Sequence, residues 1–136
     1  MTVFHALGIA GTGVTVYRKW LDAVSDNIAN MNNATTPGDP DLFRAKYVIA
    51  RANDYGRGDG GVHVGGIALG GQEGRLVYDP TNPVANEDGN VVFPEVELSS
   101  QMTQLIMAQR GYQANLSVAE RARDAYTAAL QLGRSI

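Results

Sequence analysis

The chain has no cysteine among its 136 residues. It therefore cannot form a disulfide, a cysteine-containing zinc site or a thiol nucleophile. Histidine is almost as scarce, because only His5 and His63 are present. Neither has partners at the spacing that a metal site or a general base requires, so we expect surface or packing roles for both. The composition thus predicts no metal, no cofactor and no catalytic site.

Long apolar runs and strong charge of one sign are also missing. No stretch of about 18 apolar residues occurs, so no membrane span is predicted. The net charge is −3 with acidic and basic residues well mixed, which predicts neither nucleic-acid binding nor membrane-surface binding. The start, Met1-Thr2-Val3-Phe4-His5, lacks the basic segment and continuous apolar core of a cleavable signal peptide. We therefore expect no cleaved leader.

The first segment, residues 1–36, is predicted to form one long helix that packs against other helices. Its apolar side chains recur at alternating intervals of three and four residues, which is a heptad seam: Leu7, Ala10, Val14, Tyr17, Leu21, Val24, Ile28 and Met31. Pro37 and Pro40 prevent the helix from continuing. Trp20 stands one position off this seam and is interpreted as a packing anchor.

The last segment, residues 96–136, predicts a second long helix with a less regular seam. The seam residues keep intervals of three, four or seven: Leu98, Met102, Leu105, Tyr112, Leu116, Ala119, Tyr126 and Leu130. Gln109 and Arg123 fill the seven-residue gaps, so this seam is partly polar. Gly133 is predicted to end the helix.

The middle segment, residues 37–95, predicts a small glycine-rich β insert. Residues 44–51 alternate loosely between apolar and polar, as an edge strand does. The short apolar runs at 62–64 and 67–69 are bounded by glycines, and 75–78 is another short run. The predicted fold is therefore mainly α. Long N- and C-terminal helices pack as a coiled-coil-like pair or bundle, and the β insert lies between them in one structural unit. Three glycines, Gly8, Gly11 and Gly13, each cost about 1 kcal/mol in a helix, so we expect partner chains to supply much of the order.

A calcium loop is the main alternative that the sequence raises. Asn86, Asp88, Gly89 and Glu95 match positions of an EF-hand loop that would run from residue 84 to residue 95. The first position is Val84, however, and a valine side chain cannot bind calcium. A turn at Asp88-Gly89 between short extended segments is the better prediction. A small calcium- or ligand-binding module stays open as the second hypothesis.

Phosphate binding and hydrolysis are predicted less well still. The glycine-rich stretch 56–61 lacks the lysine and hydroxyl of a phosphate-binding loop, so we interpret it as a turn or loop. Ser25 and Ser117 have no basic partner in a recognisable nucleophile setting, so a hydrolase is not predicted.

Two parts of the chain carry a resemblance to a known family. Ser25-Asp26-Asn27-Ile28-Ala29-Asn30 resembles the S-x-N-I-A-N signature of the bacterial flagellar axial proteins, the rod, hook and hook-associated subunits. Residues 76–91, together with Arg110-Gly111-Tyr112-Gln113-Ala114-Asn115, are similar to the proximal rod members of that family.

This resemblance implies a structural subunit without enzymatic activity. Such proteins are exported by the flagellar type III apparatus without cleavage of a leader, and they stack helically into a hollow shaft that transmits torque and conducts later subunits. The implied location is the rod of the basal body, on the periplasmic side of the cell envelope. The implied partners are other proximal rod subunits, the adjoining distal rod, the junction with the membrane ring and export gate, and further copies of the chain.

The resemblance and the seams together name the residues expected to mediate assembly. They are Leu7, Val14, Tyr17, Leu21, Val24, Asn27, Ile28, Asn30, Met31, Met102, Leu105, Tyr112, Asn115, Leu116, Tyr126 and Leu130. Within this set, Asn27, Asn30 and Asn115 are predicted to set register through hydrogen bonds between packed helices. The alternative for each is a capping or solvated amide.

Overall fold

The structure is a computed structural model that describes residues 2–54, 56 and 60–134. Its elements, in chain order, are α1 (Val3–Asn30), β1 (Lys46–Ala52), β2 (Val62–Leu69), β3 (Arg75–Tyr78), β4 (Asn90–Phe93) and α2 (Leu98–Arg134). The prediction of two long terminal helices around a small β insert is confirmed. No helix among these residues is long and apolar enough to cross a membrane.

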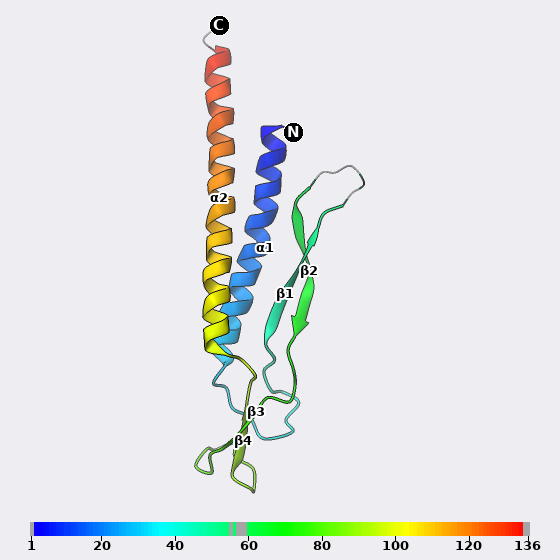
Figure 1. Ribbon diagram of the computed structural model, residues 1–136, viewed down its shortest axis with the longest axis vertical. Coiled ribbons are helices and arrows are strands. Elements are labelled where there is room, and N and C mark those ends of the chain that lie inside the picture. The colour runs from blue at the N-terminus through cyan, green and yellow to red at the C-terminus, as the bar shows by residue number, and fades with distance from the viewer. Residues whose placement is uncertain (1, 55, 57–59, 135–136) are drawn as a thin grey trace.

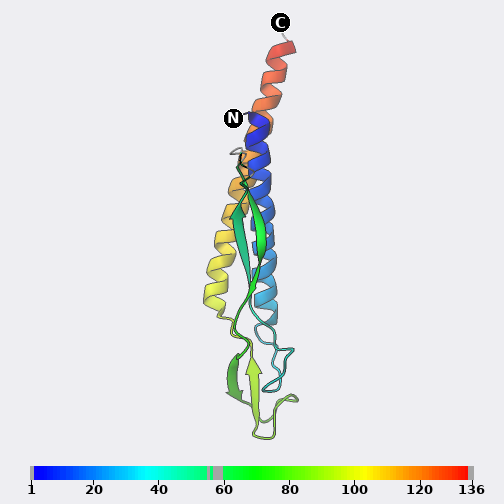
Figure 2. The ribbon, with the colours of Figure 1, turned by 90° about the vertical axis from the view of Figure 1, so that its right-hand side faces the viewer.

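The molecule is elongated, with the chain ends together at one end (Figure 1). The helices α1 and α2 lie side by side and antiparallel, and the β1–β2 hairpin runs along the other side of α1 (Figures 1 and 2). The β3–β4 pair lies beyond the helices at the opposite end from the termini. Helix α1 is therefore the middle layer, between α2 and the hairpin.

Helix α1 begins and ends for local reasons. The Thr2 hydroxyl caps its start by accepting a hydrogen bond from the His5 N–H at 3.2 Å. The helix ends at Asn30, and the Met31 N–H donates to the Ile28 carbonyl in a final tighter turn. The prolines at 37 and 40 lie farther on, in the connection to β1.

The contact between the two helices runs one residue away from much of the predicted seam. Its contact pairs are Phe4 with Tyr126, Gly13 with Asn115, Tyr17 with Gly111, Trp20 with Gln104, and Asn27 with Gln101. On α1, positions 13, 20 and 27 thus replace the predicted 14, 21 and 28. On α2, positions 101, 104, 111 and 115 replace 102, 105, 112 and 116. The predicted seam rests on aliphatic residues, whereas the two helices meet through glycines, amides and aromatic rings.

Glycine allows this close approach at two places. A Cβ on Gly111 would stand 2.7 Å from Cδ1 of the Tyr17 ring, and a Cβ on Gly13 would stand 2.7 Å from Cγ of Asn115. Trp20 stacks on Tyr17 at a centroid distance of 5.9 Å, and its indole N–H donates to Gln104 at 3.3 Å. The predicted role of Trp20 as a packing anchor is confirmed.

The strands form two separate antiparallel pairs. β1 pairs with β2, with a register shift between Ile49 and Ala50, and β3 pairs with β4. For β4 the sequence predicts only a short extended segment after the Asp88-Gly89 turn, although this strand contributes the buried Val91 and Val92. It has only four residues, which is too short for a period of two to stand out. In the predicted glycine loop, Gly56, Gly60 and Gly61 have positive φ, and residues 57–59 lie outside the described part.

One buried amide joins three elements. Asn27 is 0% exposed; its Oδ1 accepts from the Lys46 N–H at 2.8 Å, and its Nδ2 donates to the Lys46 carbonyl at 3.0 Å. The same Nδ2 donates to Oε1 of Gln101, also at 3.0 Å. Asn27 thereby connects α1 to the first residue of β1 and to the first turn of α2. Beside it, the Lys46 ammonium pairs with the Asp26 carboxylate.

Replacing Asn27 with leucine should destabilise the fold strongly. Leucine has a similar size but leaves the Lys46 backbone and the Gln101 amide without their partner, which costs about 1–3 kcal/mol for each buried polar group. We expect a loss of at least about 2 kcal/mol in the free energy of unfolding, measured by urea denaturation. Amide hydrogen exchange at Lys46 should accelerate in the same variant. Asn32→Leu, at an exposed position just after α1, is the matched control. Equal stability of the two variants would contradict the role of Asn27 in connecting α1, β1 and α2.

The helical glycines should respond to alanine in opposite directions. Gly8 and Gly11 face open space, so Gly8→Ala and Gly11→Ala should each raise stability by roughly 1 kcal/mol through helix propensity. Gly13→Ala and Gly111→Ala should lower it by about 1 kcal/mol, because the new methyl overpacks the contact between the helices. Thermal unfolding of the four single variants tests this. The same sign for all four would mean that the helices do not approach each other as described.

Candidate functional site

Several of the predicted seam residues of both helices lie on one side of the helix pair. Val14 of α1 and Tyr112 of α2 line the same cavity of about 310 Å³, together with four polar or charged residues of α1. Leu7, Leu21 and Ile28 stand seven or fourteen residues from Val14 and therefore share its face of α1. Leu105 stands seven residues before Tyr112 and shares its face of α2. We call this side of the helix pair the apolar face.

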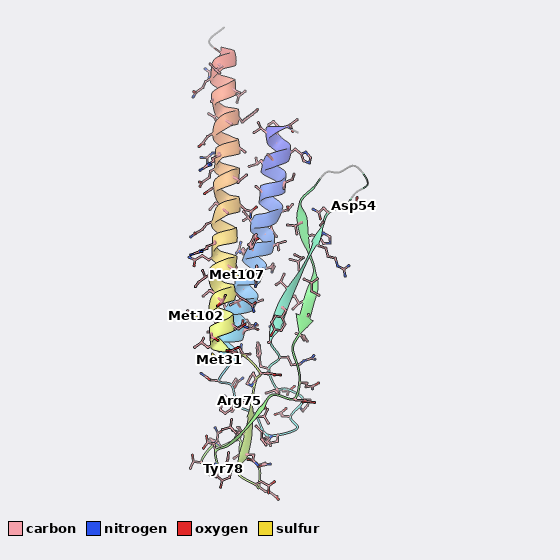
Figure 3. All side chains as sticks on the ribbon, in the orientation of Figure 1. Met31, Asp54, Arg75, Tyr78, Met102 and Met107 are labelled. Carbon is pink, nitrogen blue, oxygen red and sulfur yellow. The ribbon has the colours of Figure 1, made fainter. Side chains whose placement is uncertain are left out.

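Much of the apolar face is uncovered. Leu116 is 41% exposed and Met102 46% exposed, and Leu7, Tyr126 and Leu130 are exposed as well. Figure 3 labels Met102 near the start of α2, at the end of the helix that is closer to β3 and β4. Val14, Leu21, Ile28, Met31, Leu105 and Tyr112 are half-buried. Two members of the predicted set lie within the molecule instead, since Val24 is 1% exposed and Tyr17 packs on Gly111.

The three asparagines of the predicted set differ in what they bond. Asn27 hydrogen-bonds Gln101 across the helix pair, as predicted. Asn30 donates to the carbonyl and the carboxylate of Asp26, one turn earlier in its own helix. Asn115 donates to the Gly111 carbonyl of its own helix, and its amide lies against Gly13. Within the single chain Asn30 and Asn115 therefore bond their own helices, because an amide side chain reaches the carbonyl four residues back. Hydrogen bonds from these two residues to the helices of other subunits stay a prediction.

A second polar contact between α1 and the β insert is made by Thr12 and was not predicted. The Thr12 hydroxyl donates to the Ile9 carbonyl at 2.6 Å and accepts from the Val62 N–H at 3.1 Å. It therefore fixes the start of β2 on α1, fifteen residues before Asn27 fixes the start of β1. No sequence signal distinguishes this threonine from other helical threonines, because its partner is a backbone group fifty residues away.

The loop that resembled a calcium site is organised by its own hydrogen bonds. Oδ1 of Asn86 accepts from the N–H groups of Asp88 and Asn90 at 3.1 and 2.8 Å, and Gly89 has φ +77°. The predicted turn at Asp88-Gly89 is present and leads into β4. No group of three or more His, Asp or Glu side chains that could hold a metal occurs within residues 2–54, 56 and 60–134.

The β3–β4 end is fixed by an acidic turn. Asp79 accepts from the Thr81 hydroxyl at 2.9 Å and from the Asn82 amide at 3.2 Å. These two hydrogen bonds, chiefly the one from Thr81, lower the pKa of Asp79 below its ordinary value. Tyr78, 72% exposed, stands beside it at the tip that is farthest from the termini (Figure 3). The bonds of Asp79 hold the turn together, and they give Thr81 and Asn82 a structural role at this position.

The remaining candidates for chemistry have no reactive setting. His63 is exposed, with Nδ1 2.6 Å from Oδ1 of Asn53, in keeping with the predicted surface role. Ser25 is an exposed residue of α1 and Ser117 an exposed residue of α2. The geometry offers an elongated body with exposed apolar side chains on two antiparallel helices, which suits binding to other helices.

Comparison with known proteins identifies the family. Residues 88–132 match the model of the flagellar basal body rod FlgEFG protein C-terminal family. The chain is 33% identical over 135 residues to the flagellar basal-body rod protein FlgC of Escherichia coli O6:H1, covering 98% of this chain and 100% of the relative. It is 32% identical to FlgC of Salmonella typhimurium over the same shares of both chains.

A distant bacterium gives the same result. FlgC of Bacillus subtilis is 30% identical over 150 aligned positions, covering 98% of this chain and all of the relative. The similarity therefore includes both helices and the β insert. The relatives are structural proteins of the rod and not enzymes. The chain belongs to the FlgC family of flagellar basal-body rod proteins.

Proposed function

We propose that this rod protein is a subunit of the proximal rod that assembles helically through its apolar face into a hollow drive shaft. The observation that carries the proposal is the position of the apolar face. Its leucine and methionine side chains, such as Leu116 and Met102, are exposed, whereas the contact between α1 and α2 is made by glycines, buried amides and aromatic rings. A neighbouring subunit would cover these side chains, because full burial of a leucine or methionine contributes about 1.5–3 kcal/mol.

The partners follow from family membership together with this geometry. A rod protein assembles with other rod components. We propose that the apolar face packs with helices of other proximal rod subunits, the adjoining distal rod and further copies, in a coiled-coil-like bundle. Seven-residue spacing along Leu7, Val14, Leu21 and Ile28 supports such packing. The end of the rod would meet the junction of the membrane ring and the export gate.

Export is part of the same proposal. The first residues act structurally, since Thr2 caps α1 and Phe4 packs edge-on against Tyr126 at a centroid distance of 4.8 Å. Removal of a leader of about 15 or more residues would delete these contacts and Gly13 as well. We therefore propose that the protein reaches the periplasmic part of the rod with its N-terminal sequence retained.

A charge on the apolar face should block assembly without unfolding the chain. Leu116 is already 41% exposed in the single chain, so Leu116→Asp should leave the helical content and the monomer stability nearly unchanged. In the rod the carboxylate would be buried without a partner, at a cost of several kcal/mol in each contact. We expect loss of swimming motility and absence of rods from isolated basal bodies. Leu21→Asp, at a half-buried position of α1, should act in the same way.

Ser117→Asp is the matched control for this experiment. It places the same charge on the neighbouring exposed residue of α2, about 100° around the helix from Leu116. Asp59→Lys, the control that the sequence suggests in the glycine loop, lies outside the described residues. Ser117→Asp should leave motility intact once expression of each variant is confirmed. Normal rods from Leu116→Asp and Leu21→Asp would rule out assembly through the apolar face.

A further inference from the structure

In the part of the chain that the structure describes, strand β3 pairs along one edge only. Its partner is β4, and the far side of β4 bridges to Thr35 through Val92. Figure 2 accordingly shows β4 between β3 and the segment that follows α1. Gly74, with φ +66°, precedes the strand, and Pro80 follows two residues after its end. A strand edge without a partner presents backbone groups that can bind another strand.

The backbone groups on this edge belong to Leu76 and Tyr78. In an antiparallel pair, successive residues alternate between bonding the partner strand and pointing away from it. The Asp79 N–H donates to the Gly89 carbonyl at 2.9 Å, so Asp79, and two residues before it Val77, bond β4. The N–H and C=O groups of Leu76 and Tyr78 therefore point outward. The side chains of these two residues are also exposed, by 60% and 72%.

The sequence along this edge is complementary to itself. Two copies of the segment can lie antiparallel with Val77 opposite Val77, so that Leu76 of each copy lies opposite Tyr78 of the other. The outward backbone groups then meet, as a hydrogen-bonded pair requires, and the exposed apolar side chains lie together on one face. Arg75 of each copy lies opposite Asp79 of the other, so the charges are complementary as well. Figure 3 labels Arg75 and Tyr78, which are the first and last residues of β3.

We propose that two copies of the chain pair through β3 in this register and form a closed dimer of the free subunit. The two copies are related by a two-fold axis at Val77, so the same surface serves both and no further copy can add. The contacts of a helical shaft do not close, so the assignment of the dimer to the free subunit rests on the proposed function. Two strands of four residues bury much less than about 1,200 Å², so the dimer is weak and exchanges with the monomer. Pairing covers an edge that would otherwise be open to unrelated strands.

A single cysteine at the two-fold axis tests the register, because the natural chain has no cysteine. In purified Val77→Cys the two thiols would lie at a non-hydrogen-bonded pair with Cα atoms about 4.5 Å apart, which is within reach of a disulfide. Mild oxidation should give covalent dimers and no longer products. Tyr78→Cys is the matched control. Position 78 is more exposed, but in this register its two copies stand about 8 Å apart, so we expect at least fivefold fewer covalent dimers.

Charge variants test the same contact without a covalent bond. Sedimentation of the purified chain between roughly 10 and 500 µM should show a monomer–dimer equilibrium. Arg75→Asp places a carboxylate opposite Asp79 at both ends of the contact and should raise the dissociation constant at least tenfold. Arg121→Asp, which makes the same charge change at an exposed position of α2, should leave it unchanged. Salt should weaken the natural dimer several-fold, because exposed ion pairs are screened. Thermal unfolding confirms that each variant is folded.

Three results would each overturn the β3 pairing. They are a monomer at every concentration, equal trapping of Val77→Cys and Tyr78→Cys, and a dimer that folded Arg75→Asp leaves unchanged. Each result would leave the proposal of assembly through the apolar face standing. That proposal fails separately, if Leu116→Asp and Leu21→Asp both build normal rods.

Discussion

The full burial of one amide side chain constrains the rest of this molecule. Asn27 lies where α1, β1 and α2 meet, and it satisfies both backbone groups of Lys46 as well as Gln101. A buried amide that lost these partners would cost more than an apolar side chain gains there. The hairpin must therefore start beside the end of α1, and α2 must start opposite it. Thr12 then fixes the far end of the hairpin on the same helix.

The contact between the helices is close because glycines stand opposite an amide and an aromatic ring, and other amides bond across it. Gly13 and Gly111 let the backbones approach a neighbouring amide and ring, and Gln101 and Gln104 bond across the contact. Such a contact uses few of the leucines and methionines of the two helices. These large side chains accordingly remain at the surface, as in Met102 and Leu116. A subunit with its largest apolar groups outside is marginal alone and gains stability in an assembly.

The sequence predicted the parts of the fold that depend on the spacing of apolar residues and on the glycines and prolines that end helices and strands. Both helices followed from intervals of three and four, and the β insert followed from glycine-bounded apolar runs. The strand β4 is too short to show a strand periodicity in the sequence. Val91 and Val92 belong to a strand because they pair with β3. The contact of α1 with α2 uses positions 13, 20 and 27, each one residue before a predicted seam position. The prediction assumed that the large apolar residues fill the contact, whereas glycine and amide residues do so at these positions. The hydrogen bonds of Asn30 and Asn115 depend on which carbonyl lies nearest to each amide. The spacing of residues in the sequence does not give this information.

Because the two chain ends lie at the same end of the molecule, a force that separates them acts first on the contacts at that end. Since both termini lie at the same end of an antiparallel helix pair, pulling them apart loads the contacts in sequence and not all at once (Figure 1). The ring contact of Phe4 with Tyr126 would open first, then the close approaches at Gly13 and Gly111, and the Asn27 junction last. In the drive shaft proposed above, torque would instead act across the sides of the helices and would load these contacts together. The same pair of helices would thus open contact by contact when pulled at its ends, but not when twisted along its length.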